Sequence, residues 1–298
     1  KLAPSAEFIF KKKEAISTAQ NTLNLRYIYV ANESFSYAKD PADSLIKPQK
    51  EPFTVNHVGE LNFKHDNTRT FNPFSYNAHI EGNLEYVKIG LSGNARIDYH
   101  LKNKGFYVRA YAGKFVDLGT SKDPFSMRQR YLTTTTTGDN DYLYDETFVG
   151  RHEQTGFHAQ QITIREGGFK LPTLQYANPI GINDNWLLAL NLRSDIPVRL
   201  PVKIQLFLDL ATYADAYKLN PSGQKAIYDA GVEFHFIQDL VVVYVPLLMS
   251  KDFKDYTKQM YPKNRLLNTI SFALNFGQLP FTRTQKVMKF LKTLRPGF

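Results

Sequence analysis

Cysteine is absent from the 298-residue chain, tryptophan occurs once, and no long apolar run is present. Without cysteine the chain has no disulfide scaffold, no thiolate zinc site and no cysteine nucleophile. A helical membrane span needs about 20 consecutive apolar residues, whereas the longest run, 240–249, is short and contains Pro246. Helical membrane proteins are therefore excluded.

Aromatic residues and positive charge are abundant instead. The chain has 22 Phe and 18 Tyr, and 37 Lys and Arg against 28 Asp and Glu give a net charge of +9. An apolar content of 43% argues against wholesale disorder. Lys and Arg are spread along the chain without a basic stripe, so we do not expect a nucleic-acid partner.

Apolar and polar residues alternate along most of the chain, which predicts strands with two chemically different faces. The clearest stretch is 87–101, followed by 74–80, 202–210 and 228–236. The pattern gives roughly 13 segments, and many are as long as strands that cross a bilayer, which need about ten residues. The remaining segments lie near 5–14, 22–32, 53–66, 105–117, 142–149, 157–165, 184–193, 239–249 and 266–276.

Short and long connections alternate between these segments, as in outer-membrane barrels with short periplasmic turns and long outer loops. We therefore predict an all-β fold, an antiparallel transmembrane β-barrel of about 12 to 14 strands over 1–280, with a basic amphipathic tail at 281–298. A soluble sandwich also alternates and remains an alternative. The long connections lie at 33–52, 118–141, 166–183, 213–224 and 250–265.

The direction of the strands raises a question about the ends of the barrel. In an up-and-down order the first and last segments run the same way, which a closed antiparallel barrel with an even number of strands does not permit. We expect either one segment to be miscounted or a first strand to lie outside this chain. The N-terminal residues 1–4 contain no initiator Met and no apolar signal region, so we also expect a processed or partial chain.

The predicted inward face carries charges of both signs. Mixed charges across a narrow lumen usually pair and fill it, whereas selective pores show rings of one sign. The pattern favours a plugged or narrow barrel over an open porin. The predicted lumen network consists of Arg96, Asp98, His100, Lys203, Asp209, Asp229, Glu233 and His235.

Two further groups fit a membrane location. Aromatic side chains collect at membrane interfaces, although aromatics also favour strands in general. The segment 270–276 alternates and closes on Phe276, similar to the C-terminal signal that barrel-assembly machinery recognises. The predicted interface aromatics are Tyr142, Tyr144, Trp186, Tyr244 and Tyr261, and the predicted terminal strand signal consists of Phe272, Leu274 and Phe276.

Motifs for catalysis or metal binding are weak. His57 and His65 lie eight positions apart on a predicted strand, which separates them by about 27 Å and prevents them from sharing a metal. Four histidines have carboxylates nearby in sequence, namely His100, His152, His158 and His235, but no Gly-x-Ser-x-Gly elbow accompanies them. We therefore predict no catalytic residue, metal or cofactor, and expect no enzymatic activity in this chain.

Several stretches together resemble the C-terminal, barrel-like region of large gluzincin-type zinc aminopeptidase proteins of Gram-negative bacteria. The resemblance spans roughly 60–280, and surface-antigen barrels share the same strand-and-turn pattern loosely. The zinc-binding His-Glu-x-x-His of that family is missing here, so no catalytic residue carries over. The matching stretches are 141–146 (DYLYDE), 148–151, 167–170 (GGFK), 185–191, 228–232 (YDAGV), 243–247 (VYVPL) and 250–251.

From the pattern and the resemblance, we expect a membrane anchor or scaffold for a larger, peptidase-linked surface assembly in the bacterial outer membrane. The expected partners are the lipid bilayer, lipopolysaccharide, the barrel-assembly machinery, and an upstream peptidase domain or other envelope proteins. An outer-membrane channel or transporter, and a barrel hydrolase, are the competing functions.

Overall fold

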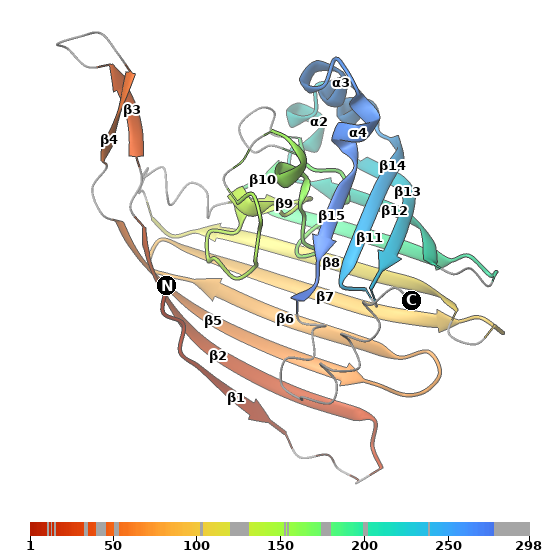
Figure 1. The fold of residues 1–298 in the computed structure, drawn as a ribbon. Helices are drawn as coiled ribbons and strands as arrows, with labels where there is room; N and C mark the ends of the chain where they lie inside the picture. Colours follow the sequence, from red (N-terminus) through yellow and green to blue (C-terminus); the bar gives the residue numbers. More distant parts are fainter. Residues whose placement is uncertain are drawn as a thin grey trace, which may run out of the picture.

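The fold is dominated by one large curved sheet in a computed structural model of the chain (Figure 1). The structure describes residues 1–276 except 11, 13, 15, 33–34, 40–45, 51–53, 102–103, 120–130, 152, 154, 174–179, 199–201 and 238. The predicted tail at 281–298 lies outside the described residues, as does His152.

The sheet is an antiparallel meander of eleven strands, in which each strand pairs with the sheet strand that follows it along the chain. This confirms that the chain is mostly antiparallel β, as the alternating pattern predicts. In spatial order the strands are β1 (Ser5–Ile9), β2 (Ala19–Asn32), β5 (Thr54–Asn67), β6 (Phe74–Gly82), β7 (Tyr86–Asp98), β8 (Gly105–Asp117), β11 (Trp186–Asp195), β12 (Lys203–Tyr213), β13 (Ile227–Phe236), β14 (Val241–Met249) and β15 (Ser271–Leu274).

The sheet is not closed into a barrel, which differs from the predicted closed structure. Within the described residues, β1 and β15 form its two edges, and β1 pairs on one side only, with β2. All pairings in the sheet are antiparallel, so with eleven strands β1 and β15 run in the same direction. Direct pairing of these two edges would be parallel, unlike every other pairing in the sheet.

The two faces of the sheet differ sharply in chemistry because side chains alternate along each strand. On β7, Lys88 points to the concave side and is buried, while Leu91 points to the convex side and is 54% exposed. On β12, Asp209 is fully buried on the concave side, while Leu206 is 51% exposed on the convex side. The concave face is therefore polar and covered, and the convex face is apolar and uncovered.

In the long connection between β8 and β11, the described residues from 131 onward cover the concave face, and we call them the inserted segment, or insert (Figure 1). The segments near 142–149 and 157–165 belong to it, so the prediction that they are strands of the sheet is wrong. Their apolar residues pack instead against the concave face of the sheet, which we call the wall. Leu143, for example, lies against Ile28, Val30 and Val58 of β2 and β5. The insert contains β9 (Leu132–Thr133), β10 (Ile182–Asn183) and the 3₁₀ turns η1 (Gly138–Asn140) and η2 (Phe157–Gln160).

The other connections match the predicted alternation of short and long, except the turn at 83–85 between β6 and β7, which is short where the alternation predicts a long loop. The long ones carry a hairpin or short helices at the same end of the sheet: β3 (Phe35–Lys39), β4 (Ile46–Lys50), α2 (Ala216–Leu219), α3 (Lys251–Met260) and α4 (Arg265–Thr269). In the part of the chain that the structure describes, no helix is both long and apolar enough to cross a membrane.

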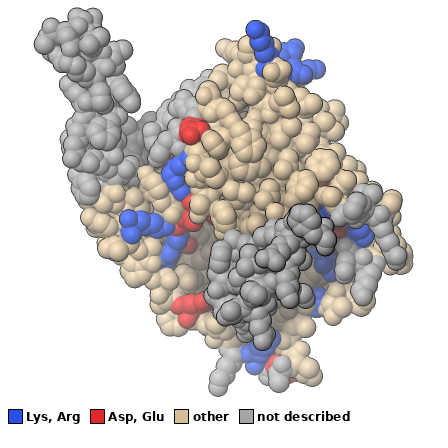
Figure 2. Space-filling model, viewed as in Figure 1, with Lys and Arg blue, Asp and Glu red and all other residues tan. Residues whose placement is uncertain are grey.

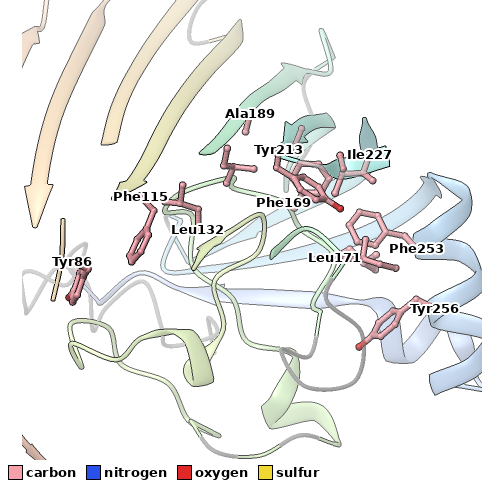
Figure 3. Close-up of a cluster of buried hydrophobic side chains, with 14 residues drawn as sticks. Tyr86, Phe115, Leu132, Phe169, Leu171, Ala189, Tyr213, Ile227, Phe253 and Tyr256 are labelled. Atoms are coloured by element: carbon pink, nitrogen blue, oxygen red, sulfur yellow. The ribbon is translucent and has the colours of Figure 1, made fainter. Parts of the chain in front are cut away.

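The largest apolar core lies where the insert meets the sheet and α3 (Figure 3). Phe169 and Leu171 of the insert are fully buried against Leu187 of β11 and Ile227 of β13. Phe253 of α3 packs edge-on against Phe169, with the ring centres 5.9 Å apart. This core fixes the position of the insert on the concave face and so positions its polar contacts.

Candidate functional site: a charged cavity beneath the inserted segment

Two carboxylates bind Lys170 of the insert to the wall, and we call this cluster the first tether. Its ammonium lies 2.9 Å from Asp209 Oδ2 and 3.1 Å from Oδ1, and all these groups are almost completely buried. Asp229, which is the cross-strand neighbour of Asp209, accepts the backbone N–H groups of Lys170 (3.1 Å) and Leu171 (3.0 Å). Asn191 joins the cluster by donating to Asp209 Oδ1 (2.8 Å) and to the Gly167 carbonyl (2.9 Å).

Gly168 lets the insert approach the wall this closely, and Gly167 lets two parts of the insert pack against each other. Gly168 has a φ of +69°, a conformation that costs other residues strain. A Cβ at Gly168 would lie 2.8 Å from Asn191 Oδ1 and 2.9 Å from an Arg109 nitrogen, and a Cβ at Gly167 would lie 2.4 Å from Thr134 Cα. The GGFK stretch therefore combines close backbone contact with the buried Lys170.

A second tether joins β7 and β8 to residues 165 and 166. Arg109 donates to the carbonyls of Arg165 and Glu166 (2.9 Å to the latter) and to Asn191 Oδ1 (2.7 Å). The Glu166 carboxylate receives the N–H of Thr133 and lies 3.6 Å from the Lys88 ammonium. The bonds from Arg109 to the two carbonyls and the contact between Lys88 and Glu166 cross from sheet to insert.

A third tether lies near the β1 edge. Arg26 on β2 holds Asp145 of the insert through two bonds of 2.7 Å, and holds Glu60 on β5 through its Nε at 2.7 Å. The Lys1 ammonium also contacts Asp145. Burial raises the pKa of the Asp145 carboxyl, but the hydrogen bonds from Arg26 and Lys1 outweigh it and hold the pKa below its ordinary value.

The lowered pKa makes the third tether sensitive to acid. Because the folded pKa of Asp145 lies below the unfolded value, its stabilisation is complete above pH about 4 and is lost as the pH falls through the folded pKa. We expect Asp145→Asn to lower the free energy of unfolding by about 1 to 2 kcal/mol at pH 7, and the difference from the unmodified chain to shrink at pH 3. Denaturant titrations at both pH values measure it.

Asp184→Asn serves as the control for this experiment, because Asp184 is an exposed aspartate that precedes β11. We expect this substitution to change the stability by less than about 0.5 kcal/mol at either pH. A loss for Asp145→Asn that is the same at pH 3 and pH 7 would contradict the assignment of Asp145 as a charged partner.

A cavity of about 690 Å³ remains between the tethers. Its wall carries ionisable groups close together: His79 Nε2 lies 3.2 Å from Glu81, and the Lys88 ammonium lies 3.9 Å from Glu81 and 3.6 Å from Glu166. Arg193 enters from β11, 3.8 Å from Glu233. Such a polar and largely charge-paired space can hold water or a small polar solute, and its groups mainly bind the insert to the wall.

The predicted lumen residues fall into separate groups. Asp209 and Asp229 join the Lys170 cluster. At the short-turn end, His235 lies between Glu233 (3.1 Å) and Asp239 (2.7 Å), and Lys203 lies 3.5 Å from Asp239. Arg96 and Asp98 pair with each other at 2.7 Å at the end of β7, and His100 is exposed in the turn that follows.

His235 does not have the surroundings of an acyl-transfer base. Both ring nitrogens of His235 face carboxylates, so neither is aimed at a serine hydroxyl. His57 and His65 lie on the convex side of β5, bonded to Tyr27 and Asn21 respectively. Among the described residues, no cluster of three His, Asp or Glu side chains is arranged to hold a metal ion.

The predicted interface aromatics lie in several environments. Trp186 begins β11 on the convex side and is partly exposed. Tyr142 and Tyr144 pack in the insert near β2 and β5, and Tyr261 follows α3. Tyr244 is buried on the concave side against Phe207, with the ring centres 6.3 Å apart.

The predicted terminal strand signal coincides with an edge of the sheet. Phe272 and Leu274 belong to β15, and Phe276 lies just beyond it. The outer side of β15 is occupied, because Ile162 of the insert donates to the Phe272 carbonyl (2.8 Å) and Phe157 stacks on the Phe272 ring at 4.6 Å. The insert thus covers this edge as well as the concave face.

The sequence did not single out the partners that the insert supplies, chiefly Lys170, Asp145 and Glu166. Two of them lie in stretches that carry the family resemblance, DYLYDE and GGFK. A lysine two residues after a pair of glycines, in a chain with aspartates at the inward positions of alternating strands, was the signal that could have identified the Lys170 cluster. No protein-family model matches the chain, and no curated protein is significantly similar to it.

Proposed function

We propose that this chain is a membrane-embedded β-scaffold of the bacterial outer membrane that anchors a larger surface assembly. One observation carries the proposal: the sheet exposes its apolar face and buries its charged face. A sheet that folds in water is expected to do the reverse, because burial of apolar surface drives folding. Apolar residues that point to the convex side and are exposed include Leu25, Leu61, Ile80, Leu91, Ile97, Leu188, Leu206, Leu210 and Leu247.

The extent of this face supports lipid as its partner. Exposed leucines and isoleucines occur from β2 at one side to β14 at the other, across most of the sheet. Monomeric soluble proteins rarely leave contiguous apolar patches larger than a few hundred Å². Hydrocarbon would cover this face without any further protein layer.

The filled interior favours an anchor over an open pore. The three tethers hold the insert on the concave face from β2 to β13. A transporter is the second candidate, and the 690 Å³ polar cavity is the observation that favours it. Steady ionic currents in planar bilayers would support that alternative, whereas an anchor without a pore conducts no current.

A lipid environment also has a consequence for the open edge. Backbone groups cannot remain unpaired in hydrocarbon, so we propose that β1 pairs with a further strand. Completing an antiparallel barrel with that strand requires the bond between the insert and Phe272 of β15 to be released. The resemblance to aminopeptidase C-terminal regions suggests what the scaffold carries: an upstream peptidase domain. Lipopolysaccharide, the barrel-assembly machinery and other envelope proteins are the remaining proposed partners, and the outer membrane the proposed location.

The single tryptophan provides a direct test of the proposal. Trp186 lies on the convex side at the start of β11, where aromatic residues sit at a membrane interface. We expect brominated phospholipids to quench its fluorescence in reconstituted protein, and bromines near the headgroup to quench more than bromines near the chain ends.

Two variants in a Trp186→Phe background calibrate the measurement. Leu91→Trp places the probe in the middle of the convex face and is expected to be quenched most by deep bromines. Tyr107→Trp places it in the cavity wall and is expected to be quenched little. Equal quenching of both variants, or none at Trp186, would overturn the membrane proposal.

A further inference from the structure

The helical end of the sheet carries a dense group of cations, which we call the basic rim. It consists of five exposed side chains on and between α3 and α4: Lys251, Lys254, Lys258, Lys263 and Arg265. Figure 2 shows Lys and Arg gathered at the end where Figure 1 places these helices.

The basic rim has little negative charge to balance it. Asp252 is buried and accepts hydrogen bonds from the backbone N–H (2.7 Å) and hydroxyl (2.5 Å) of Ser222, so it points away from the surface. Asp255 is the one exposed acid in the same stretch. None of the five cationic side chains forms an ion pair or side-chain hydrogen bond with another described residue. Their charge is therefore available to an external anion.

A hollow of about 390 Å³ lies directly against the basic rim. Lys258 and Arg265 line it from the helices, and Leu247 and Met249 line it from the end of β14. Leu266 also lines it and is 54% exposed, like Leu247 at 57%. The hollow thus has a cationic side and an apolar side.

We propose that this hollow is a binding site for an anionic phospholipid of the bilayer that surrounds the scaffold. Lys258 and Arg265 bind the phosphate, and Leu247 and Leu266 contact the first part of the acyl chains. The inference rests on the proposed membrane location and adds a specific lipid partner to it.

The position of the hollow favours a lipid over a soluble phosphate. Leu247 and Leu248 continue the apolar convex face up to the helices, and Leu248 is 66% exposed. The boundary between exposed leucines and exposed cations at this point matches the boundary between acyl chains and headgroups. A free phosphate would use the cations and leave the leucines in water.

Native mass spectrometry of the whole chain in detergent tests the site. We expect one phosphatidylglycerol to remain bound in preference to phosphatidylcholine. The variant K258E/R265E is expected to weaken phosphatidylglycerol binding by about a hundredfold, since each charge-assisted contact contributes roughly tenfold. Inorganic phosphate at millimolar concentration is not expected to displace the lipid.

A matched variant removes the same charge elsewhere. Lys64 and Lys218 are exposed but paired with Asp66 (2.8 Å) and Asp215 (2.9 Å), so K64E/K218E is expected to retain the lipid. Equal binding of the two lipids, full retention by K258E/R265E, or displacement by inorganic phosphate would overturn the site. If one of these results occurs although brominated lipid quenches Trp186, the lipid site is rejected and the proposed membrane scaffold is retained. If brominated lipid does not quench Trp186, the membrane scaffold itself is rejected.

Discussion

Replacing Lys170 with methionine is expected to lower the free energy of unfolding by about 3 to 5 kcal/mol, because it leaves a buried carboxylate without its cation. Asp209 and Asp229 are both fully buried, and Lys170 is the cation within 3.1 Å of Asp209. Methionine keeps much of the length of the side chain, so the loss reports charge more than volume. Denaturant unfolding in detergent micelles measures the loss.

Lys64→Met is the matched control for Lys170→Met. Lys64 also lies 2.8 Å from a carboxylate, that of Asp66, but its side chain is 54% exposed. Exposed ion pairs contribute about 0 to 1 kcal/mol, so a small change is expected. Adding Asp209→Asn to Lys170→Met should recover part of the stability, because the amide carries no uncompensated charge. A Lys170→Met loss as small as that of Lys64→Met would show that this cluster does not hold the insert.

Replacing Leu91 with arginine gives the second large effect and depends on what covers the convex face. Leu91 lies in the middle of β7, opposite Ala78 and Ala112 on the neighbouring strands. In a bilayer, an arginine near the midplane of a barrel costs about 2 to 4 kcal/mol, whereas at an exposed site in water it would cost less than about 0.5 kcal/mol. Folding titrations in vesicles give the difference.

Leu84→Arg makes the same chemical change outside the strands. Leu84 is 95% exposed in the turn between β6 and β7, so we expect the substitution to change the stability little. If Leu91→Arg and Leu84→Arg destabilise the protein equally, the convex face is not in contact with hydrocarbon.

The strands could be predicted from sequence because each alternates between two different environments. Stretch 87–101 is the clearest case: its even positions meet the charged interior and its odd positions the uncovered face, and the structure places β7 there. The short alternating stretch 142–149 shows the same pattern but belongs to the insert. Alternation reports two environments and does not distinguish a sheet from a loop that packs between a wall and solvent.

The charged site was predictable only in part. Asp209, Asp229 and Glu233 were identified because each lies on the inward side of an alternating strand. Their partners could not be assigned, since Lys170 is 39 residues from Asp209 in sequence and comes from a connection without periodicity. Sheet closure likewise depends on pairing between distant strands, which the local pattern does not encode.

The place of the insert in the chain has a consequence for the order of assembly. β8 and β11 pair directly although the whole connection 118–185 separates them. Joining them requires closing a long loop before their contacts form, and such non-local pairing is slow. The insert contacts strands on both sides of this connection, so it can bring the strands up to β8 and those from β11 onward together during folding. Loosening its tethers should then delay maturation at least as much as it weakens the finished protein.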